Sequence, residues 1–587
     1  MADEMLTRRH TQLSRRTILS GAALSAMAAI LSACGGSAGN ATDTPKPAAT
    51  TGAASAAAPA VGGTAKPAVQ GTPVVVEGKS DGTPVTGGSL TIAYNDVPTL
   101  DPRVSGATDW WRAGYALFDP LIYQEAGTLK LVPGLAQSWQ VSDDGKIYTF
   151  KLRQDVKFHD GTPFNADAVK YTFDSIMDPA LKSLTAIGYL GPYASTEVVD
   201  PFTAKVTFKE PYAPFLNNLT HSVLSPVSPK AGKDYNAFAA HPVGTGPFMF
   251  KEYKAQASMT FVRNPDYKWG PALMRNQGPP YLDQVTYRFV PPGEFATNLG
   301  LLQNGEVQMS NGVAPQELTN VQKDAKYQTL LPLVPGSPQI FPLNLTKAPT
   351  DDLKVRQAMF YAIDMPAIVD TLWYGGRKAA RGPLSSPTLD YNPAVESMYG
   401  YDPKKAKALL DEAGWKPGAD GIRVKDGQRL KVLTIITPGI EGKNAELAQA
   451  YLKDVGMENQ VDVQEYAQTA TRYLASEHNI ARVYFSHTDP VVLTTLYHSK
   501  NIQGTNFNRT MKPDPKLDAM LDAGQADLNP ETRKQKYFDI QQYIMDNALA
   551  IPRWEERVFW VAKANVKGLH FQPLGGPWLQ DAWIAAQ

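Results

Sequence analysis

Residues 131–173 read LVPGLAQSWQVSDDGKIYTFKLRQDVKFHDGTPFNADAVKYTF. Their first half predicts a β-hairpin, because Ser142–Gly145 combines short polar side chains with a glycine, as tight turns require, and apolar and polar residues alternate after it. Their second half predicts a helix that begins after Asn165, a residue type that caps helix amino termini. The segment therefore indicates a mixed α/β fold.

The part of this run from Pro133 to Phe173 resembles the signature of the family 5 extracellular solute-binding proteins. These are the receptors of ABC importers for peptides, opines, nickel and oligosaccharides. Further runs along residues 88–570 resemble the same family, namely residues 100–102, 241–248, 343–376, 401–415 and 482–508. The resemblance implies an α/β, two-lobed, periplasmic-binding-protein-like fold of type II, of the large cluster C kind, with an extra subdomain in the first lobe.

The resemblance also predicts how the chain is divided. A second lobe is expected at residues 340–554 and an inserted subdomain at residues 120–220. The core of the first lobe is expected to combine three separate segments, residues 89–119, 221–339 and 555–587.

The first 33 residues have the pattern of an export signal. Ser14–Leu19 matches the twin-arginine motif, and the apolar run after it is too short to span a membrane. Leu31–Ala33 and Cys34 together resemble a lipobox, and Cys34 is the chain's single cysteine. We therefore expect residues 1–33 to be a lipoprotein signal peptide and Cys34 to carry lipid, with either the twin-arginine or the general secretory route used for export.

The segment from 34 to 88 is predicted to be a disordered linker after the lipidated cysteine. It is rich in Ala, Gly, Thr and Pro, and the first aromatic residue of the chain is Tyr94. Such a composition buries too little apolar surface to offset the entropy lost on ordering. The folded body is thus expected to be tethered to the outer face of the cytoplasmic membrane, on its periplasmic or extracellular side.

Composition excludes several classes of function. The chain has 587 residues, long enough for two or three domains, and its 57 basic residues balance 57 acidic ones. This balance gives no indication of nucleic-acid binding. The eight histidines show no clustered ligand spacing, so we expect neither a metal nor a cofactor.

Two segments supply candidate ligand contacts by resemblance. The first is the loop after Leu100–Pro102, with Gly106, Thr108, Trp110 and Trp111, although the two tryptophans have an equally good interpretation as packing residues of the following helix. The second is the loop that begins at Arg482. Its candidates are Tyr484, Phe485, Ser486, His487, Asp489 and Asn506.

The second loop bears on what the ligand is. Peptide-binding members of the family have an aspartate that pairs with the free amino group of the peptide, and Ser486 takes that position here. A buried ammonium needs a paired charge, because desolvating it alone costs several kcal/mol. Either Asp489 substitutes for the missing aspartate, or the ligand lacks a free amine.

The function implied is that of a lipid-anchored, extracytoplasmic substrate-binding protein. A small solute, a peptide first and an oligosaccharide second, would bind between two hinged lobes and pass to an ABC permease with its ATPase subunits. We expect a monomer and no catalysis, since H-E-x-x-H and nucleotide-loop motifs are absent from the sequence. The alternatives are a secreted hydrolase that uses two carboxylates and a receptor that serves a signalling partner.

Overall fold

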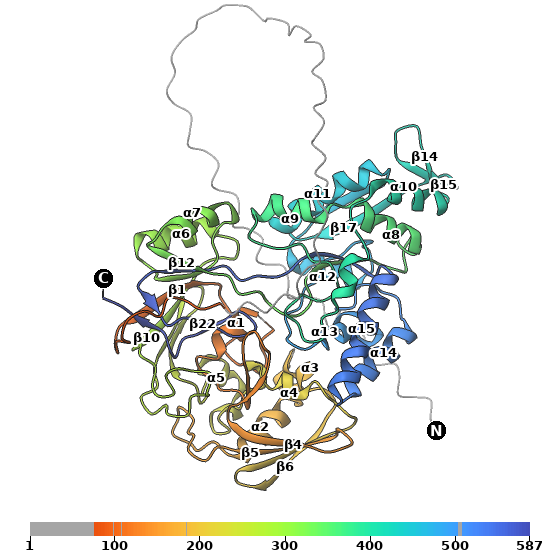
Figure 1. Cartoon of the computed structure of the whole chain (residues 1–587). Coiled ribbons are helices and arrows are strands. Elements are labelled where there is room, and N and C mark those ends of the chain that lie inside the picture. Colours follow the sequence, from red (N-terminus) through yellow and green to blue (C-terminus); the bar gives the residue numbers. More distant parts are fainter. Residues whose placement is uncertain (1–75, 98, 107, 184, 503–506, 587) are drawn as a thin grey trace, which may run out of the picture. The chain divides into compact units, whose positions relative to one another are not determined.

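The structure is a computed structural model that describes residues 76–586, except positions 98, 107, 184 and 503–506 (Figure 1). The predicted signal segment, Cys34 and Asn506 lie outside the described residues, as does most of the predicted linker. Within the described part, no helix is both long enough and apolar enough to cross a membrane.

The predicted hairpin is confirmed. Strands β4 (Ala136–Val141) and β5 (Ile147–Leu152) pair antiparallel across the turn. Gly145 has a φ of +68°, a left-handed conformation that a residue with a side chain rarely adopts. Leu528 approaches the position that a Cβ on Gly145 would occupy, at 2.9 Å, so the turn touches the far end of the chain.

The predicted helix is confirmed as α2 (Ala166–Ile176), and the side chain of Asn165 accepts a hydrogen bond from the amide of Ala168. Its apolar face covers a four-stranded sheet of order β4–β5–β7–β6, in which β6 spans Tyr193–Asp200 and β7 spans Thr203–Phe208. Phe173 and Phe215 meet edge to face at 6.1 Å between these layers. The buried aromatic rings of the subdomain belong to the same hydrophobic core as the buried residues of the first-lobe sheet.

The first lobe is built on a seven-stranded sheet (Figure 1). Its centre is parallel, because β1 (Ser89–Tyr94) pairs in parallel with both β10 and β11. Tyr94 stacks on Trp560 at 5.9 Å, which joins the first strand to a strand near the carboxyl end. The other strands, in sheet order around β1, are β12 (Tyr327–Leu330), β20 (Trp560–Lys563), β11 (Met309–Asn311), β10 (Gln284–Phe289), β9 (Ser258–Arg263) and β8 (Phe248–Lys254).

Two segments connect this sheet to the second lobe. Strand β12 leads to β13 (Gln339–Pro342), and β19 (Ala550–Trp554) leads back to β20. The connecting segments lie side by side, since the amide of Val334 donates to the carbonyl of Glu556 at 2.9 Å. Strand β20 pairs within the seven-stranded sheet of the first lobe, whereas β19 pairs with β13. We call this pair of connecting segments, residues 331–338 and 555–559, the hinge segments.

Two hydrophobic cores lie in the second lobe. One surrounds the parallel strands β17 (Lys431–Ile436) and β18 (Glu458–Val463), includes buried residues of five helices of this lobe, and continues into the first lobe through Ala93 and Val561. Another joins three helices near the carboxyl end. The helices are α8 (Leu353–Ala362), α9 (Met365–Trp373), α10 (Pro403–Glu412), α11 (Ile440–Asp454), α13 (Val492–Tyr497), α14 (Pro515–Ala526) and α15 (Pro530–Asp546).

Helix boundaries in the second lobe follow from capping residues. The side chains of Asp352, Asp364 and Asn529 each accept a hydrogen bond from a backbone amide in the first turn, as helix-capping residues do. Helix α9 ends slightly earlier than the Gly375–Gly376 pair suggests. Tyr374 already takes a left-handed φ of +50°, and Gly375 continues the left-handed turn at +77°.

The remaining elements complete the description. The shorter helices are α1 (Thr108–Gly114), α3 (Ala186–Leu190), α4 (Phe215–Asn218), α5 (Tyr235–Ala240), α6 (Phe295–Asn304), α7 (Leu318–Lys323) and α12 (Tyr466–Leu474). The shorter strands are β2 (Ile122–Gln124), β3 (Leu131–Pro133), β14 (Lys416–Pro417), β15 (Arg423–Lys425), β16 (Gln428–Arg429), β21 (Val566–Lys567), β22 (His570–Phe571), β23 (Pro577–Trp578) and β24 (Trp583–Ile584). The predicted domain boundaries stay predictions.

Candidate functional site

Three neighbouring cavities lie where the first lobe and its subdomain meet the second lobe. The largest, which we call the outer cavity, has a volume of about 750 Å³ and is walled by the subdomain on one side and by α13 and α14 on the other. A central pocket of about 20 Å³ shares Tyr189 and His487 with it. A hinge cavity of about 200 Å³ lies against both hinge segments and shares Gln572 and Pro573 with the central pocket.

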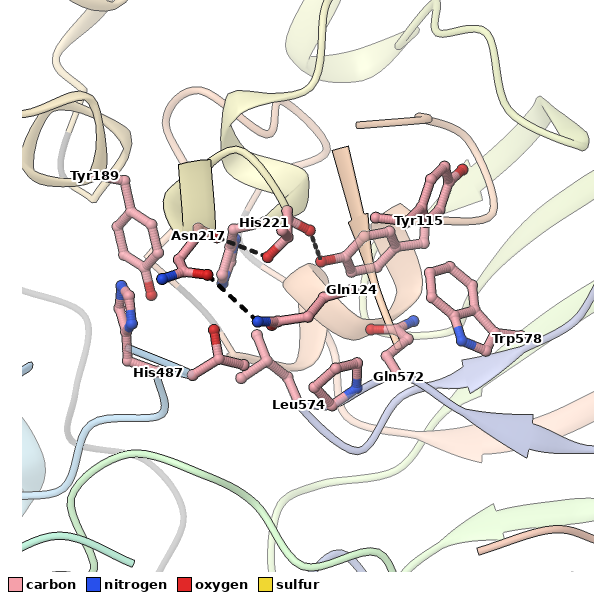
Figure 2. A pocket seen from close by; sticks show the side chains of 13 residues that line it. Tyr115, Gln124, Tyr189, Asn217, His221, His487, Gln572, Leu574 and Trp578 are labelled. Carbon is pink, nitrogen blue, oxygen red and sulfur yellow. Dashed lines mark hydrogen bonds between the residues drawn. The ribbon is translucent and has the colours of Figure 1, made fainter. Parts of the chain in front are cut away.

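Aromatic rings from both lobes close the central pocket (Figure 2). Tyr189 of α3 stacks on His487 at 4.8 Å, and its hydroxyl donates to the carbonyl of Ser486 at 3.4 Å. His221 meets Tyr189 at 4.6 Å from the first-lobe side. The loop of the second lobe predicted to bind ligand is therefore in direct contact with the subdomain.

The two predicted tryptophans have different surroundings. Trp110 is fully buried in the first-lobe core, where it packs edge to face on Phe118 at 6.5 Å. Trp111 packs on His221 at 4.7 Å and reaches across the junction to Phe485 at 6.2 Å. Both tryptophans are buried and neither is among the residues that line the three cavities, so the geometry favours the packing interpretation for both, with Trp111 packing across the junction.

The other predicted contacts of the first lobe lie nearby. Gly106 is exposed, and a Cβ at this position would lie 3.5 Å from Oγ1 of Thr185, which lines the outer cavity. Thr108 is the first residue of α1, and its side chain lies outside the description. As ligand contacts, both stay predictions.

Within the second-lobe loop, the hydroxyls of Tyr484 and Ser486 form a hydrogen bond with each other. Phe485 lines the outer cavity and packs on Phe507 at 5.4 Å. The loop lies tight against a hinge segment, because a Cβ on Gly336 would come within 2.3 Å of the carbonyl oxygen of Phe485. Movement of the hinge is therefore coupled to this loop.

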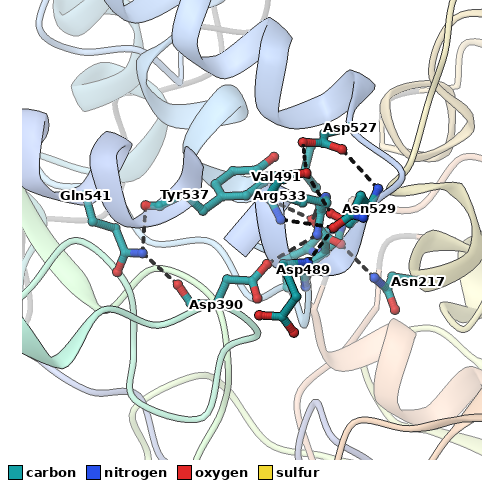
Figure 3. Close-up of polar contacts among 12 residues, drawn as sticks. Asn217, Asp390, Asp489, Val491, Asp527, Asn529, Arg533, Tyr537 and Gln541 are labelled. Carbon is teal, nitrogen blue, oxygen red and sulfur yellow. Dashed lines mark hydrogen bonds and ion pairs between the residues drawn. The ribbon is translucent and has the colours of Figure 1, made fainter. Parts of the chain in front are cut away.

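Asp489 has a different role from its neighbours (Figure 3). Its carboxylate is fully buried, pairs with Arg533 of α15 at 2.7 Å, and accepts hydrogen bonds from the side chain of Asn217 at 2.7 Å and the amide of Val491 at 2.8 Å. Burial alone would raise the pKa of Asp489, but Arg533 outweighs burial and the pKa is lowered. Asn217 belongs to the subdomain and Arg533 to the second lobe, so the carboxylate of Asp489 joins these two parts of the protein.

The buried histidines at the junction are neutral near pH 7. Burial lowers the pKa of His487 to about 4 and that of His221 well below its usual range. The Nδ1 atoms accept hydrogen bonds from the amides of Asp489 and Val223, respectively, so the ring proton lies on Nε2 in each. No partner for Nε2 of His221 is found among the described residues.

The sequence did not predict the residues that the first lobe and its subdomain contribute to the central pocket. Tyr189, His221, Asn217 and Gln572 line the central pocket, yet they are distant in sequence and belong to no motif. Only the fold brings these four side chains together.

Within the described residues, no group of three or more His, Cys, Asp or Glu side chains is arranged to hold a metal ion. Two acids near the junction are ion-paired: Glu441 contacts Arg553 at 2.5 Å, and Glu556 contacts Arg377 at 2.5 Å. The arrangement suits the enclosure of a solute by neutral and aromatic groups.

Comparison with known proteins agrees with this geometry. A family model described as bacterial extracellular solute-binding proteins, family 5 Middle, matches residues 130–505. The chain is similar to the glutathione-binding protein GsiB of Escherichia coli K12, with 30% identity over 467 residues, covering 77% of this chain and 86% of that protein. The corresponding protein of Shigella flexneri matches with the same identity and coverage.

Solved structures show the same fold. NikA from Brucella suis, in complex with Fe(III)-EDTA, has a TM-score of 0.73 at 26% identity, covering 85% of this chain and 100% of that one. The periplasmic binding protein DppA from Helicobacter pylori, in complex with the peptide STSA, has a TM-score of 0.72 at 25% identity, covering 86% and 99%. The predicted α/β, two-lobed, type II fold is confirmed, and the chain belongs to family 5 of the bacterial extracellular solute-binding proteins of ABC importers.

Proposed function

We propose that this protein is the lipid-anchored receptor of an ABC importer and that it captures a small solute between its two lobes. The observation that carries the proposal is the outer cavity, because its walls come from the subdomain on one side and the second lobe on the other. A volume of about 750 Å³ lies within the range of roughly 300–1,000 Å³ typical of small-molecule sites.

Closure about the hinge segments is the proposed mechanism. Ligand binding stabilises the closed form in proportion to its extra contacts in that form, and the permease recognises that form. The stacking of Tyr189 on His487 and the contact of Trp111 with Phe485 both cross the junction. These contacts exist only when the lobes are close together, so they are available to stabilise closure.

The anchor is proposed from the amino-terminal sequence. Cys34 follows an apolar run and a lipobox-like Leu31–Ala33, which supports lipidation at Cys34 after removal of residues 1–33. The linker that follows would let the folded body reach its permease. Delivery to a permease and its ATPase subunits, and a monomeric state, are part of the same proposal.

A peptide-like solute is the first choice and an oligosaccharide the second. Relatives at 30% identity are named for glutathione, and a structural neighbour holds the peptide STSA. The engagement of Asp489 by Arg533 and Asn217 favours the alternative in which the ligand presents no free amine to this loop.

Catalysis is not part of the proposal. A carboxylate-dependent glycosidase needs two acids that face one another across the substrate, about 5–10 Å apart. Asp489, Glu441 and Glu556 are each held by an arginine, which argues against such a role for these acids. A receptor for a signalling partner would use the same closure and differs only in the protein that it contacts.

The test combines three measurements on the mature chain. Purified protein is first examined by native mass spectrometry for a bound solute. That solute is then added to ligand-free protein, and both thermal stability and small-angle X-ray scattering are recorded. We expect a higher melting temperature, a smaller radius of gyration and no turnover. Turnover, or binding without compaction, would contradict the proposal, and crosslinking to a sensor protein in place of a permease would favour the signalling alternative.

A further inference from the structure

The chemistry of the outer cavity narrows the class of solute, an inference that rests on the proposed function. Among its described lining residues, the charged side chains Glu210 and Lys500 are exposed, and Asp522 has 60% of its side chain exposed. These charges therefore belong to the rim, where water screens them.

The described residues that form the interior of the cavity carry no net charge. Tyr189 and Tyr212 of the subdomain are buried, and His487 opposite them is neutral because burial lowers its pKa to about 4. His498 lies between Asp518 and Asp522, at 3.4 and 3.3 Å, and so faces acids already present in the protein. A solute ammonium or carboxylate deep in this cavity would have no free counter-charge and would be strongly disfavoured.

Two buried polar atoms in the walls lack a hydrogen-bond partner among the described residues. They are Oδ1 of Asn218, on the subdomain side, and Oγ1 of Thr494 in α13, on the second-lobe side. The exposed fractions of these residues are 1% and 4%. Nδ2 of Asn218 already donates to the carbonyl of Tyr189 at 2.8 Å, which fixes the amide with its oxygen available as an acceptor. Buried polar atoms in native proteins are normally satisfied, so these two call for a ligand or solvent partner.

Aromatic surface completes the site. Phe485 and Phe507 line the second-lobe wall, and Tyr189 and Tyr212 line the subdomain wall. Flat apolar faces together with isolated hydroxyl and amide groups suit sugar rings or capped amides, which combine apolar faces with hydroxyl, N–H or carbonyl groups. We propose that the outer cavity binds an uncharged, hydroxyl- or amide-bearing part of the solute, either a peptide without charged ends or an oligosaccharide, with hydrogen bonds to Asn218 and Thr494.

Matched pairs of solutes test the proposal by calorimetry and thermal shift on the mature protein. The probes are tri-alanine, the same peptide acetylated and amidated at its ends, glutathione, and the neutral trisaccharides maltotriose and cellotriose. We expect a neutral probe to bind about tenfold or more tightly than tri-alanine or glutathione, since charged ends lose their hydration without gaining a partner.

A substitution separates ligand contacts from folding. Thr494→Val keeps the shape of the side chain and removes the unpartnered oxygen, so the ligand-free protein should keep its melting temperature while affinity for the neutral probe falls about tenfold. The control is Thr245→Val. Thr245 is also buried, but its hydroxyl donates to Asp119 at 2.9 Å and it is not among the residues that line the cavity, so this change should lower the melting temperature and leave affinity unchanged.

Each outcome is decisive. Equal or tighter binding of tri-alanine or glutathione would overturn the neutral-solute inference and leave the solute-binding function intact. An unchanged affinity in the Thr494→Val protein would overturn the assignment of Thr494 as a contact. If no probe binds, and a concentrated extract of growth medium also gives no shift, both this inference and the proposed function are contradicted.

Discussion

The two ends of the loop from Tyr484 to Asp489 differ in how their polar groups are used. Asp489 is charged, fully buried and saturated by Arg533, Asn217 and a backbone amide. At the other end, Phe485 and His487 face the outer cavity, where neutral groups predominate and two wall atoms lack partners. The difference shows that the charged residue of this loop stabilises the contact between the two lobes, whereas the neutral residues of the loop are available to contact a solute.

The largest effect is expected at the charged end. Asp489→Asn removes the nearer counter-ion of the buried Arg533 and leaves it only Asp390, at 3.5 Å. Removal of one partner of a buried ion pair costs about 3–5 kcal/mol of unfolding free energy. Urea unfolding of the mature protein measures the loss. The double variant Asp489→Asn with Arg533→Met should recover much of the stability. A single variant within about 1 kcal/mol of the parent would show that the pair is not structurally important.

The second-largest effect is expected in the pH dependence of the unfolding free energy, through His487. His487 has a pKa of about 4 in the folded protein and about 6.5 when unfolded, so the unfolded chain binds a proton first as the pH falls. The neutral form of His487 thus stabilises the folded protein above pH 6.5. As the pH falls from 6.5 to 4, up to about 3 kcal/mol of unfolding free energy is lost.

The variant His487→Asn tests this pH dependence, because asparagine has no group that titrates in this range. Its Oδ1 replaces Nδ1 of His487 as acceptor for the Asp489 amide. Of the charged groups beside His487, Asp489 opposes the lowered pKa and Arg533 reinforces it, and both remain in the variant. We expect a flatter stability profile from pH 7 to pH 4, measured by urea unfolding. Replacement of the exposed His241 serves as control, and an identical profile in both variants would contradict the assignment.

The third effect lies where the loop meets the hinge. Gly336→Ala would place a Cβ 2.3 Å from the carbonyl oxygen of Phe485 at a φ of +121°, so we expect a loss of about 2–3 kcal/mol together with weaker ligand binding. Gly375→Ala is the matched control. Gly375 has a φ of +77° and no atom within 4 Å of the position that a Cβ would take. Its replacement by alanine therefore measures backbone strain alone, with an expected loss of about 1 kcal/mol of unfolding free energy. Equal losses in the two variants would disprove the close contact.

The smallest effect is expected from Tyr189→Phe. This change removes the hydroxyl that donates to Ser486 at 3.4 Å and keeps the ring that stacks on His487. A long hydrogen bond contributes less than about 1 kcal/mol, so stability should barely change. Scattering measurements of the ligand-bound state should show a closed fraction close to that of the parent, whereas Tyr189→Ala should reduce it. Failure of the alanine variant to do so would show that the stack is not part of closure.

Local signals in the sequence predicted much of the fold. The turn at Ser142–Gly145 and the cap at Asn165 depend on neighbours within a few residues, and both were confirmed. Strand β19 could not be placed from its own residues. Its pairing with β13 depends on a partner over 200 residues away, and both strands are almost continuously buried, which hides the alternation that marks a strand face.

The site was predictable only in part, for a related reason. The second-lobe loop is contiguous, so resemblance located Tyr484–Asp489, but it could not show that Asp489 is neutralised by Arg533 from a separate helix. The sequence alone left Trp110 and Trp111 equivalent. Their different surroundings depend on which face of the short helix α1 meets the core.

A crystal structure of the protein with its co-purified solute is the most direct test of the central claim. Density in the outer cavity is the expected result, between Tyr189 and Phe485, with a neutral group of the solute bonded to Asn218 and Thr494 and Asp489 still paired with Arg533. Density on another surface, or a solute ammonium held by an Asp489 that has released Arg533, would contradict the account.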